Sequence, residues 1–207
     1  SLAMIENFDC ISKEQQMQLL SGICEDADWL MRMVENLLSV TRIDGNGANL
    51  IKTPIVLEEL VDTVLVKFRK RYSTYTIHVD IPEEFISIPM VPVLIEQVLV
   101  NLLENAVQHA KGMTELKLKV YILENRAIFE IEDNGCGIPN ERLSNIFTGF
   151  FEPKDAPVDY QKRSMGIGLS VCATIIKAHG GDISAKNRKS GGGVFRFSLE
   201  LEGEEHE

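Results

Sequence analysis

The 207-residue chain carries 31 Asp and Glu against 21 Lys and Arg, which gives a net charge of −10. This acidic balance argues against a nucleic-acid backbone or an anionic membrane as the main partner. The four cysteines are scattered without a CxxC pair, so we expect free thiols in a reducing cytosol rather than a disulfide framework. No stretch approaches the roughly 20 apolar residues of a membrane span.

The first predicted element is a long amphipathic helix. Ser12 and Gln15 fit a capping box that would begin it. Apolar residues then alternate three and four apart, at Leu20, Ile23, Ala27, Leu30, Val34, Leu37 and Thr41. This spacing is an a/d seam over three heptads. A single helix must bury such a stripe, and no other heptad segment follows, so the predicted partner is another chain or a helix outside this sequence.

After a Gly- and Asn-rich linker at 44–50 the elements become short. Strands are predicted at 51–56, 76–81, 85–88, 115–123, 127–132, 182–187 and 194–201, and helices at 57–72, 93–111 and 168–179. The predicted fold class is α+β, a two-layer sandwich in which one mixed sheet is covered on one side by helices.

The sequence "NLLENAVQH" places two asparagines four residues apart on a predicted helix. Asn101, Asn105 and His109 follow one another at intervals of four, and Gln108 falls on the same face. Asparagine is a poor helix former, whereas its amide oxygen can ligate Mg²⁺ beside substrate phosphates. A solvated polar stripe is the alternative interpretation.

The sequence "DNGCGIP" follows a predicted strand directly. Gly135 and Gly137 would let the backbone approach a ligand closely, and Asp133 could accept a hydrogen bond from an exocyclic amine such as that of adenine. An ordinary tight turn is the alternative, since Asp-Asn-Gly is also turn chemistry.

The sequence "SMGIGLSV" (164–171) opens a predicted helix with two glycines, which favours an anion site at the helix N-terminus. A plain helix start is the alternative. The preceding segment, 145–163, is long enough to be a lid or a disordered loop; its Lys154, Lys162 and Arg163 could reach phosphates or be solvated. The later "SGGG" (190–193) alone indicates an ordinary loop.

The order of these motifs resembles that of sensor histidine kinases: Asn-x-x-x-Asn, Asp-x-Gly-x-Gly, a Phe-headed loop, Gly-x-Gly-Leu and a glycine-led last strand. From about Leu50 to Leu201 the chain is similar to their catalytic ATP-binding domain, of the Bergerat-type fold shared with Hsp90-, gyrase- and MutL-type ATPases. The heptad helix resembles the second helix of a dimerisation and phosphotransfer hairpin. The resemblance therefore implies two domains, 1–46 and 47–207. The stretches "NLLENAV" and "HGGDISAKN" are similar to the KdpD-like branch, which pairs with a response regulator in potassium control.

The resemblance implies ATP and Mg²⁺ as ligands. Asn101 and Asn105 would hold the metal, Asp133 the adenine amine, and Phe147, Phe150 and Phe151 would head a mobile lid. The implied nucleotide-binding set is Asn101, Asn105, Gln108, Asp133, Gly135, Gly137, Ile138, Phe147, Phe151, Gly166, Ile167, Gly168 and Leu169.

The resemblance also implies a kinase rather than a hydrolase. Hydrolysing relatives carry a general-base Glu where this chain has Asn101, whose amide cannot take a proton. Glu104 points roughly 100° away from Asn105 around the helix. None of the four histidines lies in a phospho-acceptor box, so the acceptor is expected upstream of this sequence, and this chain alone is not expected to phosphorylate itself.

The resemblance further implies a response regulator as partner, a homodimer of the full-length protein through the heptad helix, and a cytoplasmic domain of a membrane-anchored parent. No nucleic acid and no membrane contact are expected for this chain. Gln108 replaces a common phosphate-binding lysine, and Ser164 replaces the usual first glycine of the third motif. Two alternatives stay open: a hydrolytic ATPase of the same fold, and a degenerate, non-catalytic interaction module.

Overall fold

The computed structural model describes residues 12–44, 50–148 and 167–201. Its contacts divide the chain into two units, Ser1–Leu38 and Ser39–Glu207. The predicted domain boundary at 46/47 lies outside the described residues. Among the described helices, none combines the length and apolar character that crossing a bilayer requires.

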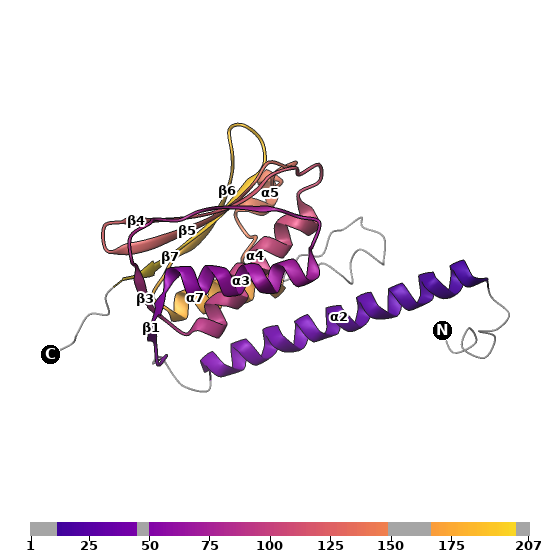
Figure 1. Ribbon diagram of the computed structural model, residues 1–207, viewed down its shortest axis with the longest axis horizontal. Coiled ribbons are helices and arrows are strands. Elements are labelled where there is room, and N and C mark those ends of the chain that lie inside the picture. The colour runs from indigo at the N-terminus through magenta and orange to yellow at the C-terminus, as the bar shows by residue number, and fades with distance from the viewer. Residues whose placement is uncertain (1–11, 45–49, 149–166, 202–207) are drawn as a thin grey trace. The chain divides into compact units, whose positions relative to one another are not determined.

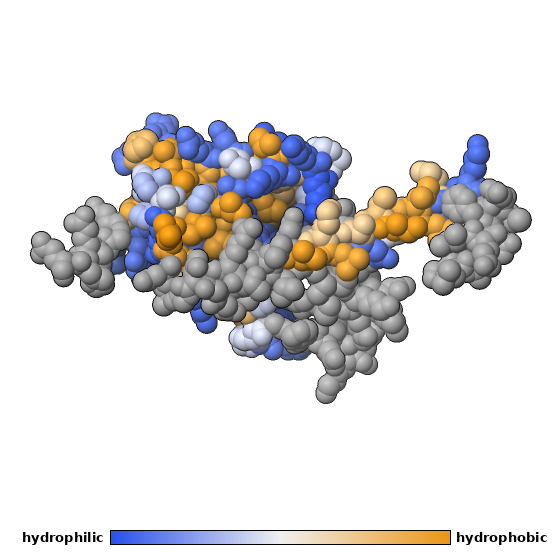
Figure 2. Space-filling view, turned by 90° about the horizontal axis from the view of Figure 1, so that it is seen from below, coloured by the Kyte–Doolittle hydropathy of each residue, from blue (hydrophilic) through white to orange (hydrophobic). Residues whose placement is uncertain are grey.

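Helix α2 (Lys13–Asp44) begins at the predicted capping box. The Gln15 N–H donates to Ser12 Oγ at 3.2 Å, and the Ser12 N–H donates to Gln15 Oε1 at 3.1 Å. Each side chain thus satisfies a backbone donor that a helix start leaves unpaired. Four residues of the predicted seam are between 49% and 62% exposed: Leu20, Ile23, Leu30 and Val34. Figure 2 shows apolar residues gathered along this helix, so α2 carries an apolar stripe that the described residues do not bury.

The second unit is an α+β sandwich, as predicted (Figure 1). Its five-stranded sheet has the order β2-β4-β5-β7-β6, in which only the β2–β4 pair is parallel. The strands are β2 (Ile77–Asp80), β4 (Leu116–Leu123), β5 (Arg126–Asp133), β6 (Ile183–Asn187) and β7 (Gly193–Glu200). Helices α3 (Leu57–Arg71), α4 (Pro92–His109) and α7 (Ile167–Ala178) cover one face. A short helix, α5 (Asn140–Leu143), follows β5 in the chain.

Besides the predicted mixed sheet, the described residues form a second, two-stranded sheet that the sequence did not predict. Within the described residues, strands β1 (Thr53–Val56) and β3 (Ser87–Met90) pair only with each other, antiparallel. Both predicted strands also began too early. Ile51 is 85% and Phe85 77% exposed, so neither apolar side chain belongs to a buried strand face.

The core lies between the large sheet and its helices. Strand β4 alternates buried Leu116, Leu118 and Val120 with half-buried polar or aromatic neighbours, which is the period of a strand with one covered face. At the sheet centre Phe129 and Phe197 lie in register, with ring centroids 4.6 Å apart. Helix α4 starts with Pro92 at its first turn, where the missing N–H costs nothing.

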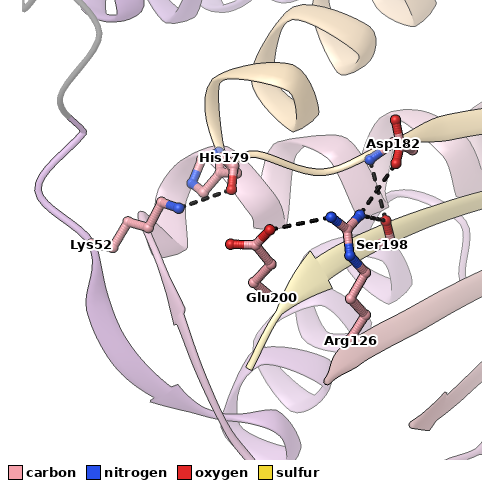
Figure 3. A network of polar contacts seen from close by, with 6 residues as sticks. All are labelled: Lys52, Arg126, His179, Asp182, Ser198 and Glu200. Carbon is pink, nitrogen blue, oxygen red and sulfur yellow. Dashed lines mark hydrogen bonds and ion pairs between the residues drawn. The ribbon is translucent and has the colours of Figure 1, made fainter. Parts of the chain in front are cut away.

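Arg126 links the C-terminal strands at one end of the sheet through hydrogen bonds and ion pairs (Figure 3). Its Nη1 donates to Asp182 Oδ2 at 3.2 Å and to Ser198 Oγ at 3.3 Å, and its Nη2 donates to Glu200 Oε1 at 3.2 Å. One guanidinium from β5 thereby joins β7 and the residue that precedes β6. The planar fork of arginine suits such a set of acceptors.

His179, directly after α7, is only 1% exposed and forms hydrogen bonds with residues of other segments. Its Nδ1 lies 2.7 Å from the Ile175 carbonyl oxygen, and its Nε2 accepts the Val91 N–H at 3.1 Å. Both contacts are satisfied by the neutral ring with its proton on Nδ1. Lys52 Nζ donates to the carbonyl oxygen of His179 at 2.8 Å, as Figure 3 shows. Burial lowers the pKa of His179; the bond to Ile175 opposes this shift and the Lys52 charge adds to it.

This geometry predicts that acid destabilises the fold through His179. An unfolded histidine has a pKa of about 6.5, above the folded value, so between pH 7.5 and 5.5 the unfolded state takes up a proton that the folded state excludes. Stability should therefore fall with decreasing pH, by up to about 1.4 kcal/mol per pH unit for one proton. Urea unfolding at three pH values measures this.

The His179→Gln variant should lose less stability over the same pH range than the wild type. The matched control is His78→Gln, which changes an exposed histidine on the edge strand β2 and should retain the wild-type pH dependence. An NMR titration of the His179 ring tests the same point without a variant. Equal pH dependence in all three proteins would contradict the expectation.

Candidate functional site

Helix α4 presents both predicted metal-ligating asparagines. The Asn101 amide nitrogen lies 3.8 Å from Cys172 Sγ on α7, and that sulfur lies 3.9 Å from the Val98 carbonyl oxygen. Burial raises the pKa of Cys172 to about 12, so its thiol remains protonated. Asn105, one turn further along, is half-buried, and its side chain forms no hydrogen bond with any other described residue. Both amides are thus on a helix whose other side packs in the core.

Glu104 lies on the side of α4 that faces α3. Its side chain is buried, and its Oε1 accepts from Arg71 Nη1 at 3.2 Å. The carboxylate is therefore held by a cation of a neighbouring helix, in the direction that the 3.6-residue period predicts. It is not placed as a general base beside Asn105.

Asp133 ends strand β5 and is 5% exposed. Its Oδ1 accepts the Gly135 N–H at 2.9 Å, which is an Asx-type turn. No described residue donates to its Oδ2. A Cβ at Gly193 would stand 3.0 Å from that oxygen, so the bare glycine of β7 leaves the space beside it. One carboxylate oxygen thus shapes the loop, and the other is left for a donor from elsewhere.

The second motif is joined to the C-terminal end of α4. A Cβ at Gly135 would lie 2.8 Å from the carbonyl carbon, the oxygen and the Cβ of Ala110. The Cys136 N–H donates to the Lys111 carbonyl oxygen at 3.1 Å. Close backbone approach at Gly135 is therefore what brings the Asp133 loop against the helix that carries Asn101 and Asn105.

The β6–β7 hairpin holds the other end of this loop. Asn187 Oδ1 accepts the Ile138 N–H and Asn187 Nδ2 donates to the Ile138 carbonyl, both at 2.7 Å. Gly137 has a φ of +75°, and a Cβ there would meet Asn187 Oδ1 at 2.9 Å. A Cβ at Gly192 would stand 1.9 Å from the Asp133 carbonyl oxygen. The hairpin and the loop fit together only because glycines line their contact.

The third motif meets the first at the start of α7. A Cβ at Gly168 would be 4.0 Å from the Asn101 amide, so the first turn of α7 lies beside that side chain. Ile167 is the first residue of the helix, and Leu169 packs against the core. The ring of Phe147 lies edge-on to Phe195 of β7 at 6.2 Å between centroids. Phe150, Phe151, Gly166 and the basic residues of 154–163 lie outside the described residues.

Gln108 contacts the end of helix α3. Its amide nitrogen lies 3.3 Å from the hydroxyl of Tyr72, the residue that follows α3. The exposed Gln108 side chain therefore has a polar partner at the end of α3, and its predicted role toward nucleotide stays a prediction.

The sequence interpretation missed several residues that shape the site: Cys172, Ala110, Asn187, Arg188 and Gly192. Arg188 Nη1 donates to the Asp133 carbonyl oxygen at 3.2 Å. The three consecutive glycines that lead into β7, the last of them its first residue, were a signal that could have been used, because such a run permits one backbone to approach another. The other residues carry no local pattern that points to the site.

Among the described residues, no group of three or more His, Cys, Asp or Glu side chains could hold a metal ion. The donor set that the site offers to a cation is the asparagine pair. Amide oxygens suit Mg²⁺ when the remaining ligands are water and phosphate, so the residues present fit this ion only together with a phosphate-bearing ligand.

Comparison with known proteins shows the family to which the chain belongs. Residues 90–203 match the family model described as histidine kinase-, DNA gyrase B- and HSP90-like ATPase. The chain is 37% identical to the sensor protein KdpD of Clostridium acetobutylicum over 96% of its length, and 36% identical to the Escherichia coli sensor protein KdpD over 81%. It spans about a fifth of each relative: 22% and 18%.

Solved structures agree with the fold. The catalytic domain of histidine kinase ThkA superimposes with a TM-score of 0.62 at 28% identity, over 73% of this chain and 97% of that chain. Histidine kinase ThkA in complex with response regulator protein TrrA gives a TM-score of 0.72 over 99% of this chain and 59% of that chain, at 23% identity; this second likeness concerns the fold alone.

The glycine contacts predict unequal effects of added methyl groups. Gly135→Ala should lower the free energy of unfolding by about 1–3 kcal/mol, because its Cβ would overlap the Ala110 backbone. Gly168→Ala is the matched control: its Cβ meets only ordinary van der Waals contact, and alanine favours a helix. Urea unfolding checks both variants. Equal stability of the two would contradict the close approach at Gly135.

Proposed function

The chain belongs to the histidine kinase-, DNA gyrase B- and HSP90-like ATPase family, and from this we propose that it binds Mg²⁺·ATP and donates the γ-phosphate to a histidine, for relay to a response regulator. It contains the ATP-binding catalytic domain of sensor histidine kinases, which are protein-histidine kinases. The observation that carries the proposal is the meeting of three motifs around α4, with an amide at Asn101 and the nearby carboxylate, Glu104, held by Arg71.

The adenine would be recognised by Asp133. Its Oδ2 receives no hydrogen bond from the described residues and can accept one from the exocyclic amine. The backbone around this carboxylate carries no side chains at three positions, Gly135, Gly137 and Gly193. A guanine presents a carbonyl oxygen in place of that amine, so the carboxylate would select adenine.

The triphosphate would lie between α4 and the first turn of α7. The N-terminus of α7 offers backbone N–H groups and the positive end of the helix dipole, and Gly168 lies beside Asn101. Asn101 and Asn105 would hold Mg²⁺ through their amide oxygens. When bound, the ion would offset the negative charge of the phosphates. The amide at Asn101 cannot activate water, which favours transfer to an external nucleophile over hydrolysis.

The remaining parts of the proposal concern assembly. The apolar stripe of α2 supports a homodimer of the full-length protein, because a helix with such a face needs a partner. A response regulator as phosphate acceptor, and a membrane-anchored parent with this domain in the cytoplasm, follow from the family resemblance alone. Because the chain spans about a fifth of its KdpD relatives, these are proposals about the larger protein.

Nucleotide binding should depend on Mg²⁺ and on the Asp133 carboxylate. In calorimetry with a non-hydrolysable ATP analogue, we expect binding that weakens when EDTA removes the ion. Asp133→Asn should reduce affinity for the ATP analogue by roughly 10- to 100-fold, which is the usual cost of a lost charged hydrogen bond, and should change affinity for a GTP analogue far less. Absence of binding at millimolar analogue would favour a non-catalytic module.

Phosphate transfer should require a histidine supplied from outside the described domain. With ATP labelled at the γ-position, the chain alone should release phosphate slowly and remain unlabelled. Joined downstream of a hairpin helix that bears an acceptor histidine, it should become labelled in an acid-labile form. Fast phosphate release by the wild-type chain would instead support the hydrolytic alternative; Asn101→Glu, which introduces a possible base, is the comparison protein.

A further inference from the structure

Cys172 touches one turn of helix α4 at two places. Its sulfur lies 3.9 Å from the Val98 carbonyl oxygen and 3.8 Å from the Asn101 amide nitrogen. The side chain is completely buried. A thiol has a single hydrogen, so the hydrogen that it donates to Val98 leaves sulfur lone pairs for the amide protons of Asn101.

The two ends of an asparagine amide have nearly the same shape but opposite hydrogen-bonding character. Rotation of the amide by 180° would replace the oxygen with the nitrogen at the same position. A divalent cation accepts only the oxygen. Whatever contacts the nitrogen therefore determines whether the amide of Asn101 is ready for an ion.

We infer that Cys172 is a positioning residue, which holds the Asn101 amide nitrogen toward α7 so that the amide oxygen is presented to the divalent ion of the bound nucleotide. This inference rests on the proposed function of Asn101. It adds to that function a residue that touches neither nucleotide nor metal and acts through a neighbouring side chain.

A second contact of α7 supports the inference. Gly168 lies one turn before Cys172, and a Cβ there would be 4.0 Å from both Cγ and Nδ2 of Asn101. Two successive turns of α7 thus border the same amide, one with bare backbone and one with sulfur.

The test compares two substitutions of Cys172, one that keeps the side-chain volume and one that keeps the hydrogen-bonding groups. Cys172→Val fills the volume but has no acceptor; Cys172→Ser keeps a donor and an acceptor but is smaller. Calorimetry with a non-hydrolysable ATP analogue is run with Mg²⁺ and with EDTA. We expect Cys172→Val to weaken binding in Mg²⁺ roughly 2- to 10-fold, the range of one hydrogen bond, and to leave binding in EDTA unchanged. Cys172→Ser should retain more of the Mg²⁺-dependent affinity than Cys172→Val.

A role in packing alone would give the reverse ranking. The valine would then be the better replacement, and both conditions would weaken equally; that result would overturn the inference. Side-chain amide NMR of the wild-type chain supplies a test without a variant. The Asn101 amide protons should exchange slowly with solvent, and rapid exchange would equally overturn it.

A double-mutant cycle separates this inference from the proposed function. In an Asn101→Ala background, Cys172→Val should have no further effect on Mg²⁺-dependent binding, because the side chain through which it acts is gone. An undiminished effect would sink the positioning role alone. If Asn101→Ala itself leaves the Mg²⁺ dependence intact, the proposed metal role of Asn101 fails first.

Discussion

Helix α4 has to satisfy two opposing demands along 18 residues. One side must be apolar, since Leu94, Val98, Leu99 and Leu102 lie in the core. Another side carries amides, which are poor helix formers and have to be kept in defined orientations. Neighbouring elements contact these polar side chains and the end of the helix: Cys172 contacts Asn101, Arg71 binds Glu104, and the Asp133 loop lies against Ala110. The candidate site lies where these elements pack against the same helix.

A chain with a net negative charge can bind an anion only where the local electrostatic potential is positive. Several basic side chains of the described domain are already committed, since Arg71 pairs with Glu104, Arg126 with Asp182 and Glu200, and Arg188 with Glu132. Within the described residues, the α7 dipole and an accompanying cation would add positive potential for a triphosphate. A bound Mg²⁺ would thus offset phosphate charge in a domain where these arginines are already paired with carboxylates.

Local patterns predicted most of the fold. The capping box, the alternating strand β4 and the three helices of the second unit follow from hydrogen-bonding chemistry and periodicity over a few residues. The separate β1–β3 sheet could not be predicted, because pairing between residues 53–56 and 87–90 depends on a non-local choice that periodicity does not encode. The exposed Ile51 and Phe85 show the same limit, since hydrophobicity alone does not specify burial.

In the candidate site, too, residues in local motifs could be predicted and residues that act through long-range contacts could not. Asn101, Asp133 and Gly168 stand in recognisable local motifs, and the structure brings their neighbourhoods together. The residues that hold them, Cys172 and Asn187, are separated from their contacts by 71 and 49 positions and carry no motif of their own. Gln108 lies in the same motif, and its amide contacts Tyr72, so its role at the site stays a prediction.

The close approach of Gly192 to the Asp133 carbonyl affects the order in which the parts of the domain can fold. Strand β7 is the last of the described strands, yet it lies between β5 and β6 and contacts the loop that would receive adenine. A polypeptide emerging from the ribosome can form the β4–β5 hairpin early. The Asp133 loop that follows β5, however, has no contact with β7 until residues near 193 have been synthesised and have paired with β5. Nascent chains should therefore gain affinity for nucleotide only after the residues of β7 have been synthesised and have paired with β5, because long-range strand pairing is slow in such topologies.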